Sequence, residues 1–267
     1  MEGGRQTFPR KILSPIAPSA VKDGHSATVP KEMTEEEILI VIEAFTQAAV
    51  RAKKAGFDGG VQLHCAHGFL LSNFISPYTN RRTDRWGGGS VENRARIVTE
   101  IVRRIKEETG SNFPIFVKMN ATDGFQPGTA KAELGLTISQ AMETAKLLEK
   151  AGVCAIEVSG GISEAGGVTI KTAINSPSKE AYFKEYSKNI KSAVSIPVIL
   201  VGGIRSLSVM EGLLENGFAD LISMSRAFIS EPDLILKLKS GEAEKARCVS
   251  CNLCFDPEGI RCNFEFD

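Results

Sequence analysis

Two histidines lie three residues apart in a short segment that changes from apolar to polar. His64 and His67 are two of only three histidines in the chain, and they follow the alternating strand pattern of residues 61–64. Parallel α/β folds build their active sites where strands end. Three interpretations are open for this pair: donors to a carbonyl or oxyanion above a cofactor, metal ligands, or loop histidines that bond to the backbone.

A second group of residues has the pattern of a phosphate site. Gly202 and Gly203 end one predicted strand just before a helix that begins near Ser206, and Ser225 and Arg226 end the next strand. Glycines let backbone N–H groups approach an anion, a helix N-terminus favours negative charge, and a guanidinium can complete a phosphate clamp. The alternative is that the glycines only terminate a strand.

Lys118 lies in an otherwise apolar predicted strand, where a charge is costly unless it is paired. It could hold an anionic part of a cofactor, form a Schiff base, or extend to solvent from the strand end.

Four of the six cysteines crowd the last twenty residues with the spacing C-x2-C-x2-C-x7-C: Cys248, Cys251, Cys254 and Cys262. In a reducing cytosol such clustering suggests metal ligation more readily than disulfides, and the spacing resembles iron–sulfur ligand runs.

Hydrophobic periodicity predicts the elements that position these residues. Residues 1–32 form an irregular lead-in, and a T-x-x-E capping box starts the first helix at Thr34. Five apolar strands then follow, each with a helix after it: 60–64, 115–119, 154–158, 197–201 and 221–224. The helices are expected from about 90 and over 137–151, 180–193, 206–216 and 232–239. This alternation predicts a parallel α/β sheet. Polar groups at nearly every strand end favour a barrel of the TIM (β/α)8 type over an open doubly wound sheet.

Composition excludes several classes of function. The 267 residues carry zero formal net charge, so nothing favours a nucleic-acid or membrane-surface partner. No apolar run approaches the roughly 20 residues that span a bilayer, and MEGGRQTFPRK has no apolar signal core. We therefore expect a cytoplasmic protein. The arginine-rich run 80–86 is interpreted as an ion-paired loop that braces the site.

With these residues in view, the chain resembles the Old Yellow Enzyme group of NADH:flavin oxidoreductases. The stretch HCAHGFLLSNFISPYTNRRTDRWGG…SVENRAR is similar to a long motif of that family, and further matches lie in residues 17–21, 30–38, 117–123, 198–204 and 219–234. The resemblance implies an FMN-binding (β/α)8 barrel over residues 1–247 and a Cys-rich tail over 248–267. About five βα units are present. Residues 3–6 resemble the sequence after the family's third strand, so we expect an incomplete barrel, either a fragment or one that a partner chain completes.

The resemblance also implies roles for individual residues. His64 and His67 would hold a substrate oxygen above the flavin, and Lys118 would support the charge of reduced flavin. The FMN phosphate would be bound by Gly202, Gly203, Ser225 and Arg226. Phe69 stands where the family usually has a proton-donating tyrosine, and Ser225 replaces a usual glycine.

Three hypotheses follow from this resemblance. The first is hydride transfer from NADH or NADPH through FMN to the activated alkene of a small α,β-unsaturated carbonyl compound, in a possible homo-oligomer. The second is an iron–sulfur flavoprotein of the dienoyl-CoA reductase or amine dehydrogenase kind, whose 4Fe–4S cluster is held by the tail cysteines. The third is an inactive barrel fragment.

Overall fold

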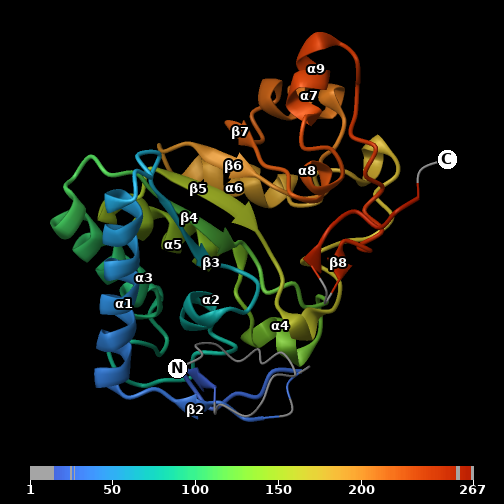
Figure 1. The fold of residues 1–267 in the computed structure, drawn as a ribbon. Helices are drawn as coiled ribbons and strands as arrows, with labels where there is room; N and C mark the ends of the chain where they lie inside the picture. The colour runs from blue at the N-terminus through green and yellow to red at the C-terminus, as the bar shows by residue number, and fades with distance from the viewer. Residues whose placement is uncertain (1–14, 25, 27, 257–258, 266–267) are drawn as a thin grey trace.

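The centre of the molecule is a parallel sheet whose strands lie side by side in chain order. The computed structural model describes residues 15–24, 26, 28–256 and 259–265. Its five-stranded sheet has the order β3-β4-β5-β6-β7 (Figure 1). The strands are β3 (Val61–Cys65), β4 (Ile115–Asn120), β5 (Ala155–Ser159), β6 (Val198–Leu200) and β7 (Leu221–Ile222). All five predicted strands are confirmed, although the last ends two residues early.

The main helices lie on one side of this sheet. They are α1 (Glu35–Lys54), α3 (Val91–Thr109), α5 (Ile138–Ala151), α6 (Lys184–Ala193) and α7 (Leu207–Glu215). Helix α1 packs on α3, α3 on α5, and α5 on α6 (Figure 1). A doubly wound sheet would carry helices on both faces, so this arrangement is the wall of a barrel. Within the described residues β3 and β7 each pair on one side only, and the chain therefore covers part of a barrel.

Side-chain caps start the three longest helices where the sequence predicts them. Thr34 accepts a hydrogen bond from the Glu37 amide at 3.2 Å, and the Glu37 carboxylate accepts from the Thr34 amide at 2.8 Å. Thr137 forms the same reciprocal box at α5, and Ser90 caps α3. Such caps satisfy N–H groups that have no partner within the helix, and they fix where each helix leaves the preceding loop.

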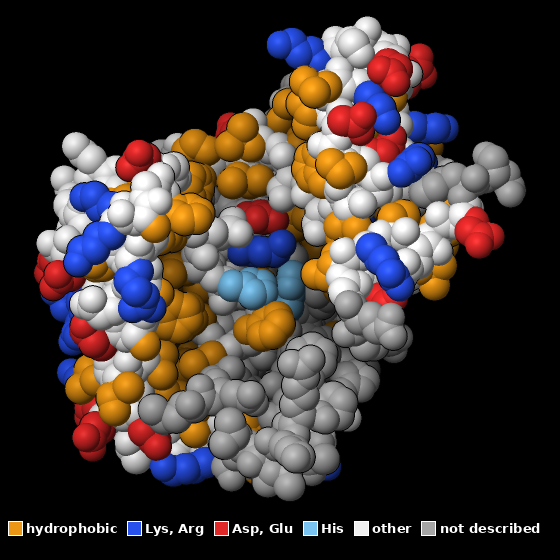
Figure 2. Space-filling view, in the orientation of Figure 1, with side chains coloured by type: hydrophobic (Ala, Val, Ile, Leu, Met, Phe, Trp, Pro, Cys, Tyr) orange, Lys and Arg blue, Asp and Glu red, His pale blue; other side chains and the backbone are white. Residues whose placement is uncertain are grey.

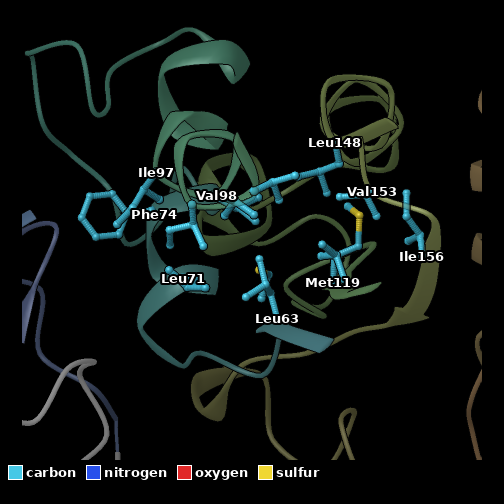
Figure 3. Close-up of a cluster of buried hydrophobic side chains, with 14 of the residues drawn as sticks. Leu63, Leu71, Phe74, Ile97, Val98, Met119, Leu148, Val153 and Ile156 are labelled. Atoms are coloured by element: carbon cyan, nitrogen blue, oxygen red, sulfur yellow. The ribbon is translucent and has the colours of Figure 1, made fainter. Parts of the chain in front are cut away.

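The apolar sides of the strands pack beneath these helices. Leu63, Met119 and Ile156 project from three neighbouring strands toward Val98 of α3 and Leu148 of α5, and all five are buried (Figure 3). A second core lies under α7 and α9 (Leu234–Ser240) and includes Leu200, Ile204, Leu213, Leu234 and Leu238. Burial of one strand face leaves the opposite face to carry polar side chains.

Several short elements were not predicted. In the lead-in, β1 (Ile16–Ala17) pairs in parallel with β2 (Lys31–Glu32), while residues 1–14, including 3–6, lie outside the described part. The others are α2 (Leu70–Ile75), α4 (Ala130–Leu134), α8 (Arg226–Ser230), and the antiparallel pair β8 (Phe255–Asp256) and β9 (Gly259–Ile260). The helix expected near 180 begins at Lys184 because Ala181 adopts a left-handed φ of 53°. Among the helices of the described residues, none has the length and apolar character needed to cross a membrane.

Candidate active site

Polar side chains line the face of the sheet that the helices leave uncovered. In the strand register His64 pairs with Lys118, and Lys118 pairs with Glu157. Registered residues of neighbouring parallel strands project to the same side of the sheet. Figure 2 shows the outcome as a hollow in which acidic, basic and histidine side chains gather. Three strands therefore deliver charged or imidazole groups to one place.

The two histidines lie together, and neighbouring strands hold the second one. Their ring centroids are 5.2 Å apart in an edge-on arrangement. His67 has a left-handed φ of 63°, and its amide donates to Asn120 Oδ1 at 3.1 Å. Its Nε2 lies 2.7 Å from Ser159 Oγ. Left-handed backbone is uncommon for a residue with a side chain, and these two contacts secure it at the hollow.

Burial keeps both imidazoles uncharged at neutral pH. Desolvation lowers the pKa of His67 to about 3, and the nearby Lys118 ammonium and His64 add to this effect. Desolvation also lowers the pKa of His64, with Lys118 acting in the same direction and Glu157 opposing it. Neutral imidazoles with one N–H each can donate to a ligand oxygen.

Phe69 and His64 face an apolar cavity beside the polar hollow. The two rings lie 4.9 Å apart between centroids. The cavity, about 350 Å³, is lined by His64, Phe69 and aliphatic or aromatic residues that include Val41, Phe45 and Leu70. Phe69 is partly exposed and offers no proton to this space.

Lys118 is held by a buried carboxylate that the sequence reading did not single out. Its Nζ lies 2.9 Å from Glu157 Oε1. The same carboxylate accepts from Gln62 Nε2 at 2.9 Å and from Ser223 Oγ at 3.1 Å. The sequence does point to Glu157, because burying an acid in the apolar run 155–158 is as costly as burying Lys118 in the neighbouring strand. Ser159 and Asn120 had no such signal.

A cavity of about 250 Å³ joins Lys118 and His67 to the predicted phosphate residues. Its lining includes Lys118, His67, Ser159, Gly203, Ser225 and Arg226. Gly203 has a φ of 69° and Gly202 a φ of 145°, both in the region that favours glycine. Gly202 uses its carbonyl to accept from the Tyr182 amide at 3.3 Å. The Arg226 guanidinium donates through Nη1 to the Lys171 carbonyl at 2.9 Å, at the start of α8.

A carboxylate of this chain already takes the amides at the start of α7, so the helix N-terminus itself is not open to a phosphate, and the site at the glycine turn and Arg226 stays a prediction. Glu180 accepts from the amides of Arg205 and Ser206 at 2.8 and 3.0 Å and from Ser206 Oγ at 2.6 Å. The Arg205 guanidinium donates to the carbonyls of Ile174 and Ala246. The groups left for an anion are those of Gly203, Ser225 and Arg226.

One small cavity is bordered by Arg226 and lined by the four tail cysteines, Cys248, Cys251, Cys254 and Cys262. Burial raises the pKa of Cys254, and Cys248 and Cys251 raise it further. All four thiols are free. Within the described residues, no three histidine, cysteine or acidic side chains are grouped closely enough to hold a single metal ion.

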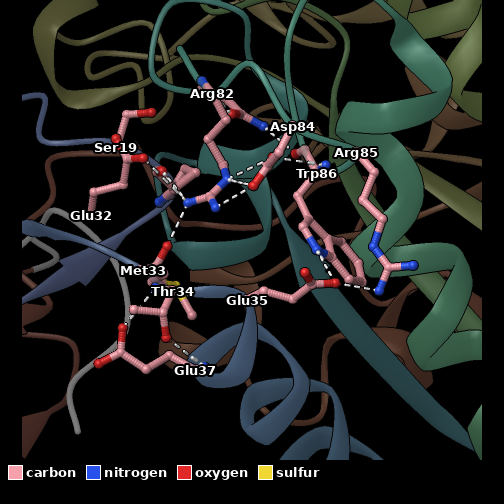
Figure 4. Close-up of polar contacts among 12 residues, drawn as sticks. Ser19, Glu32, Met33, Thr34, Glu35, Glu37, Arg82, Asp84, Arg85 and Trp86 are labelled. Carbon is pink, nitrogen blue, oxygen red and sulfur yellow. Dashed lines mark hydrogen bonds and ion pairs between the residues drawn. The ribbon is translucent and has the colours of Figure 1, made fainter.

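The arginine-rich loop is ion-paired, as expected. Arg82 is buried and donates to Asp84 Oδ1 at 3.0 Å and to the carbonyls of Pro18 and Met33 at 3.0 and 2.6 Å (Figure 4). Arg85 pairs with Glu35 of α1. These contacts tie the loop to the lead-in and to α1, and so fix the segment that follows α2.

The comparisons with known proteins identify a family. A family model described as "NADH:flavin oxidoreductase / NADH oxidase family" matches residues 4–245. An NADH oxidase of Thermoanaerobacter brockii is 42% identical over 254 residues, which is 94% of this chain and 37% of that protein. The chain thus spans little more than a third of that relative's length.

Solved structures give the same picture of the fold. A 2-naphthoyl-CoA reductase complex matches with a TM-score of 0.76 and 30% identity, over 87% of this chain and 34% of that one. An old yellow enzyme homologue from Zymomonas mobilis matches with a TM-score of 0.69 and 24% identity, over 93% of this chain and 67% of that one. At this identity the second match supports the fold alone.

Proposed function

The chain belongs to the NADH:flavin oxidoreductase / NADH oxidase family, and from this premise we propose that it binds FMN in the 250 Å³ cavity. The proposed activity is hydride transfer from NADH or NADPH to the activated alkene of a small α,β-unsaturated carbonyl compound. The observation that carries the proposal is the donor set of one cavity, which has Gly203, Ser225 and Arg226 in its wall together with Lys118 and His67.

The residues of this cavity fit FMN. Among the described residues the amides of Gly203 and Ser225 have no hydrogen-bond partner, and with the Arg226 guanidinium they form a donor set suited to phosphate. Lys118 supplies a cation for the electron-rich edge of the ring system. FMN, when bound, would accept hydride from the nicotinamide and pass it to the substrate.

The histidine pair would orient the substrate. As neutral donors, His64 and His67 can hold a carbonyl or phenolate oxygen. When the oxygen belongs to an α,β-unsaturated carbonyl compound, these hydrogen bonds polarise the conjugated alkene toward hydride. Ser159 and Asn120 would keep His67 in place through the contacts at its ring and amide. Phe69 carries no acidic proton, so protonation of the product would depend on another donor.

The phosphate assignment is tested by comparing FMN with riboflavin, which lacks the phosphate. Arg226→Met should weaken FMN binding about tenfold or more, since a hydrogen bond to a charged group contributes roughly 1.5–3 kcal/mol. Riboflavin affinity should not change. Quenching of flavin fluorescence reports both dissociation constants, and Arg103→Met, on the exposed face of α3, is the matched control. Equal weakening of both flavins, or failure of the unaltered chain to take up FMN, would contradict the proposal.

A second candidate function is favoured by the four cysteines that line one cavity. A 4Fe–4S cluster takes one thiolate per iron and so does not require three ligands around a single ion. The residues to hold it would be Cys248, Cys251, Cys254 and Cys262. Anaerobic reconstitution followed by iron analysis should give about four irons per chain, and Cys254→Ser should lower this figure. An iron-free protein would exclude this candidate.

A further inference from the structure

Glu157 is an acid in the middle of a wholly buried strand. Every residue of β5 is buried, and Glu157 is 6% exposed. Its carboxylate receives hydrogen bonds from three directions: Gln62 of β3, Lys118 of β4, and Ser223 just after β7. A buried charge is retained at acceptable cost only when it is paired and hydrogen-bonded in this way. An apolar residue at this position would fill the same space in the core, so packing does not explain why the residue is an acid.

The position of Glu157 relative to the cavity defines what it can do. Lys118 lines the cavity, whereas Glu157 is absent from its lining. Among the described residues Glu157 is the only acidic partner of Lys118. The carboxylate therefore contacts the ammonium without lining the cavity itself, so it would act on a bound ligand mainly through Lys118. Ser223 and Gln62 hold the Glu157 carboxylate in place, and the carboxylate in turn fixes the orientation of the Lys118 ammonium.

We propose that Glu157 is a positioning residue of the flavin site, which orients the Lys118 ammonium and sets the net charge that FMN meets there. This inference rests on the proposed function. The Lys118–Glu157 ion pair is neutral overall. An unpaired Lys118 would favour reduced flavin, which carries more negative charge than the oxidised form, more strongly than the pair does. Glu157 thus keeps the flavin easier to reoxidise.

The central experiment is Glu157→Gln, which removes the charge and keeps an oxygen for Lys118 and Ser223. The Gln62 amide can turn to accept from the new amide. We expect the midpoint potential of bound FMN to become more positive, with reduced FMN bound about tenfold more tightly relative to oxidised FMN. Glu185→Gln, on the exposed face of α6, should leave the potential unchanged. An unchanged or more negative potential in Glu157→Gln would overturn the inference.

A double-variant cycle tests whether the effect passes through Lys118. Lys118→Met should make the potential more negative. In that background Glu157→Gln should shift the potential less than it does in the unaltered chain, because only the direct effect of the carboxylate charge remains once there is no ammonium to orient. Equal shifts in both backgrounds would show that Glu157 does not act through Lys118. Glu157→Asp, which keeps the negative charge, should leave the midpoint potential of bound FMN close to that of the unaltered chain.

A flavin-free measurement separates failure of this inference from failure of the proposed function. If the chain takes up no FMN, the proposed function fails, and the ion pair is then followed through His64 by NMR. With only three histidines in the chain, His64→Gln identifies the signal. Glu157→Gln should lower the pKa of His64, because Glu157 opposes the effects of burial and Lys118 there. An unmoved His64 pKa would overturn the charge-setting role.

Discussion

His67 and Lys118 line the same cavity with different charges, and their surroundings account for the difference. His67 is buried beside an ammonium, which lowers its pKa to about 3. Lys118 has the Glu157 carboxylate 2.9 Å away. One wall of the cavity thus presents a neutral imidazole, which we propose holds a substrate oxygen, and a cation, which we propose faces a flavin edge. The two roles depend on neighbours in the sheet more than on the residue types themselves.

Burial of neutral His67 should make the fold sensitive to acid. Its pKa of about 3 lies below the ordinary 6.5, so between these values the unfolded chain binds more protons than the folded chain. The stability from neutral His67 is therefore complete above about pH 6.5 and is lost as pH falls toward 3. Urea unfolding should show a steeper loss with acid for the unaltered chain than for His67→Gln. Parallel pH profiles would contradict this.

Phe69→Tyr should restore a proton donor beside His64. The two rings are 4.9 Å apart and share the apolar cavity. A positioned general acid contributes about 10²–10⁴-fold, so turnover of an enone should rise by up to about a hundredfold if protonation is limiting. Reduction of bound FMN by NADH, followed by stopped-flow absorbance, should not change and serves as the internal control. Unaltered enone turnover would mean that another group delivers the proton.

At the scale of elements, Glu180 connects the loop before α6 to the start of α7. Its buried carboxylate satisfies three donors at Arg205 and Ser206, and this sets the turn that carries Gly203. Glu180→Ala should lower the free energy of unfolding by about 2–4 kcal/mol, since each buried donor left unsatisfied costs roughly 1–3 kcal/mol. Urea titration measures the change. Glu185→Ala, on exposed α6, should cost under about 0.5 kcal/mol, and a similar loss in both variants would contradict the role of Glu180.

The same elements show what the sequence could predict. Helices α1, α3 and α5 begin directly after Thr34, Ser90 and Thr137 because side-chain caps at these residues fix their starts, and the five strands show as apolar runs. The start of α6 depends on a left-handed Ala181, which has no local signal. The carboxylate at the start of α7 could not be predicted for a long-range reason, because Glu180 lies 25 residues before Arg205 in the chain. Pairs such as Lys118 and Glu157 likewise emerge only when the strand register is known.

For the whole molecule, Arg226 lies between the cavity proposed for FMN and the cavity lined by the tail cysteines. It borders both the cavity of Lys118 and the cavity of the four cysteines. Asn252 of the tail accepts from its Nη1 at 2.5 Å, and the Ser250 carbonyl accepts from the Ala173 amide at 3.2 Å. The tail therefore supports the wall of the larger cavity, while neither core cluster includes a residue beyond Ala246.

Removal of residues 248–267 should accordingly weaken flavin binding without unfolding the rest of the chain. The far-UV circular dichroism and the thermal midpoint should change little, because both cores remain. FMN affinity should fall about tenfold, equivalent to ~1.4 kcal/mol, because Arg226 loses the Asn252 contact and the loop at Ala173 loses its anchor. Asn252→Ala isolates the first of these losses and should give a smaller decrease. Unfolding of the shortened chain would show that the tail is part of the folded unit, and unchanged FMN affinity would show that Arg226 is positioned without it.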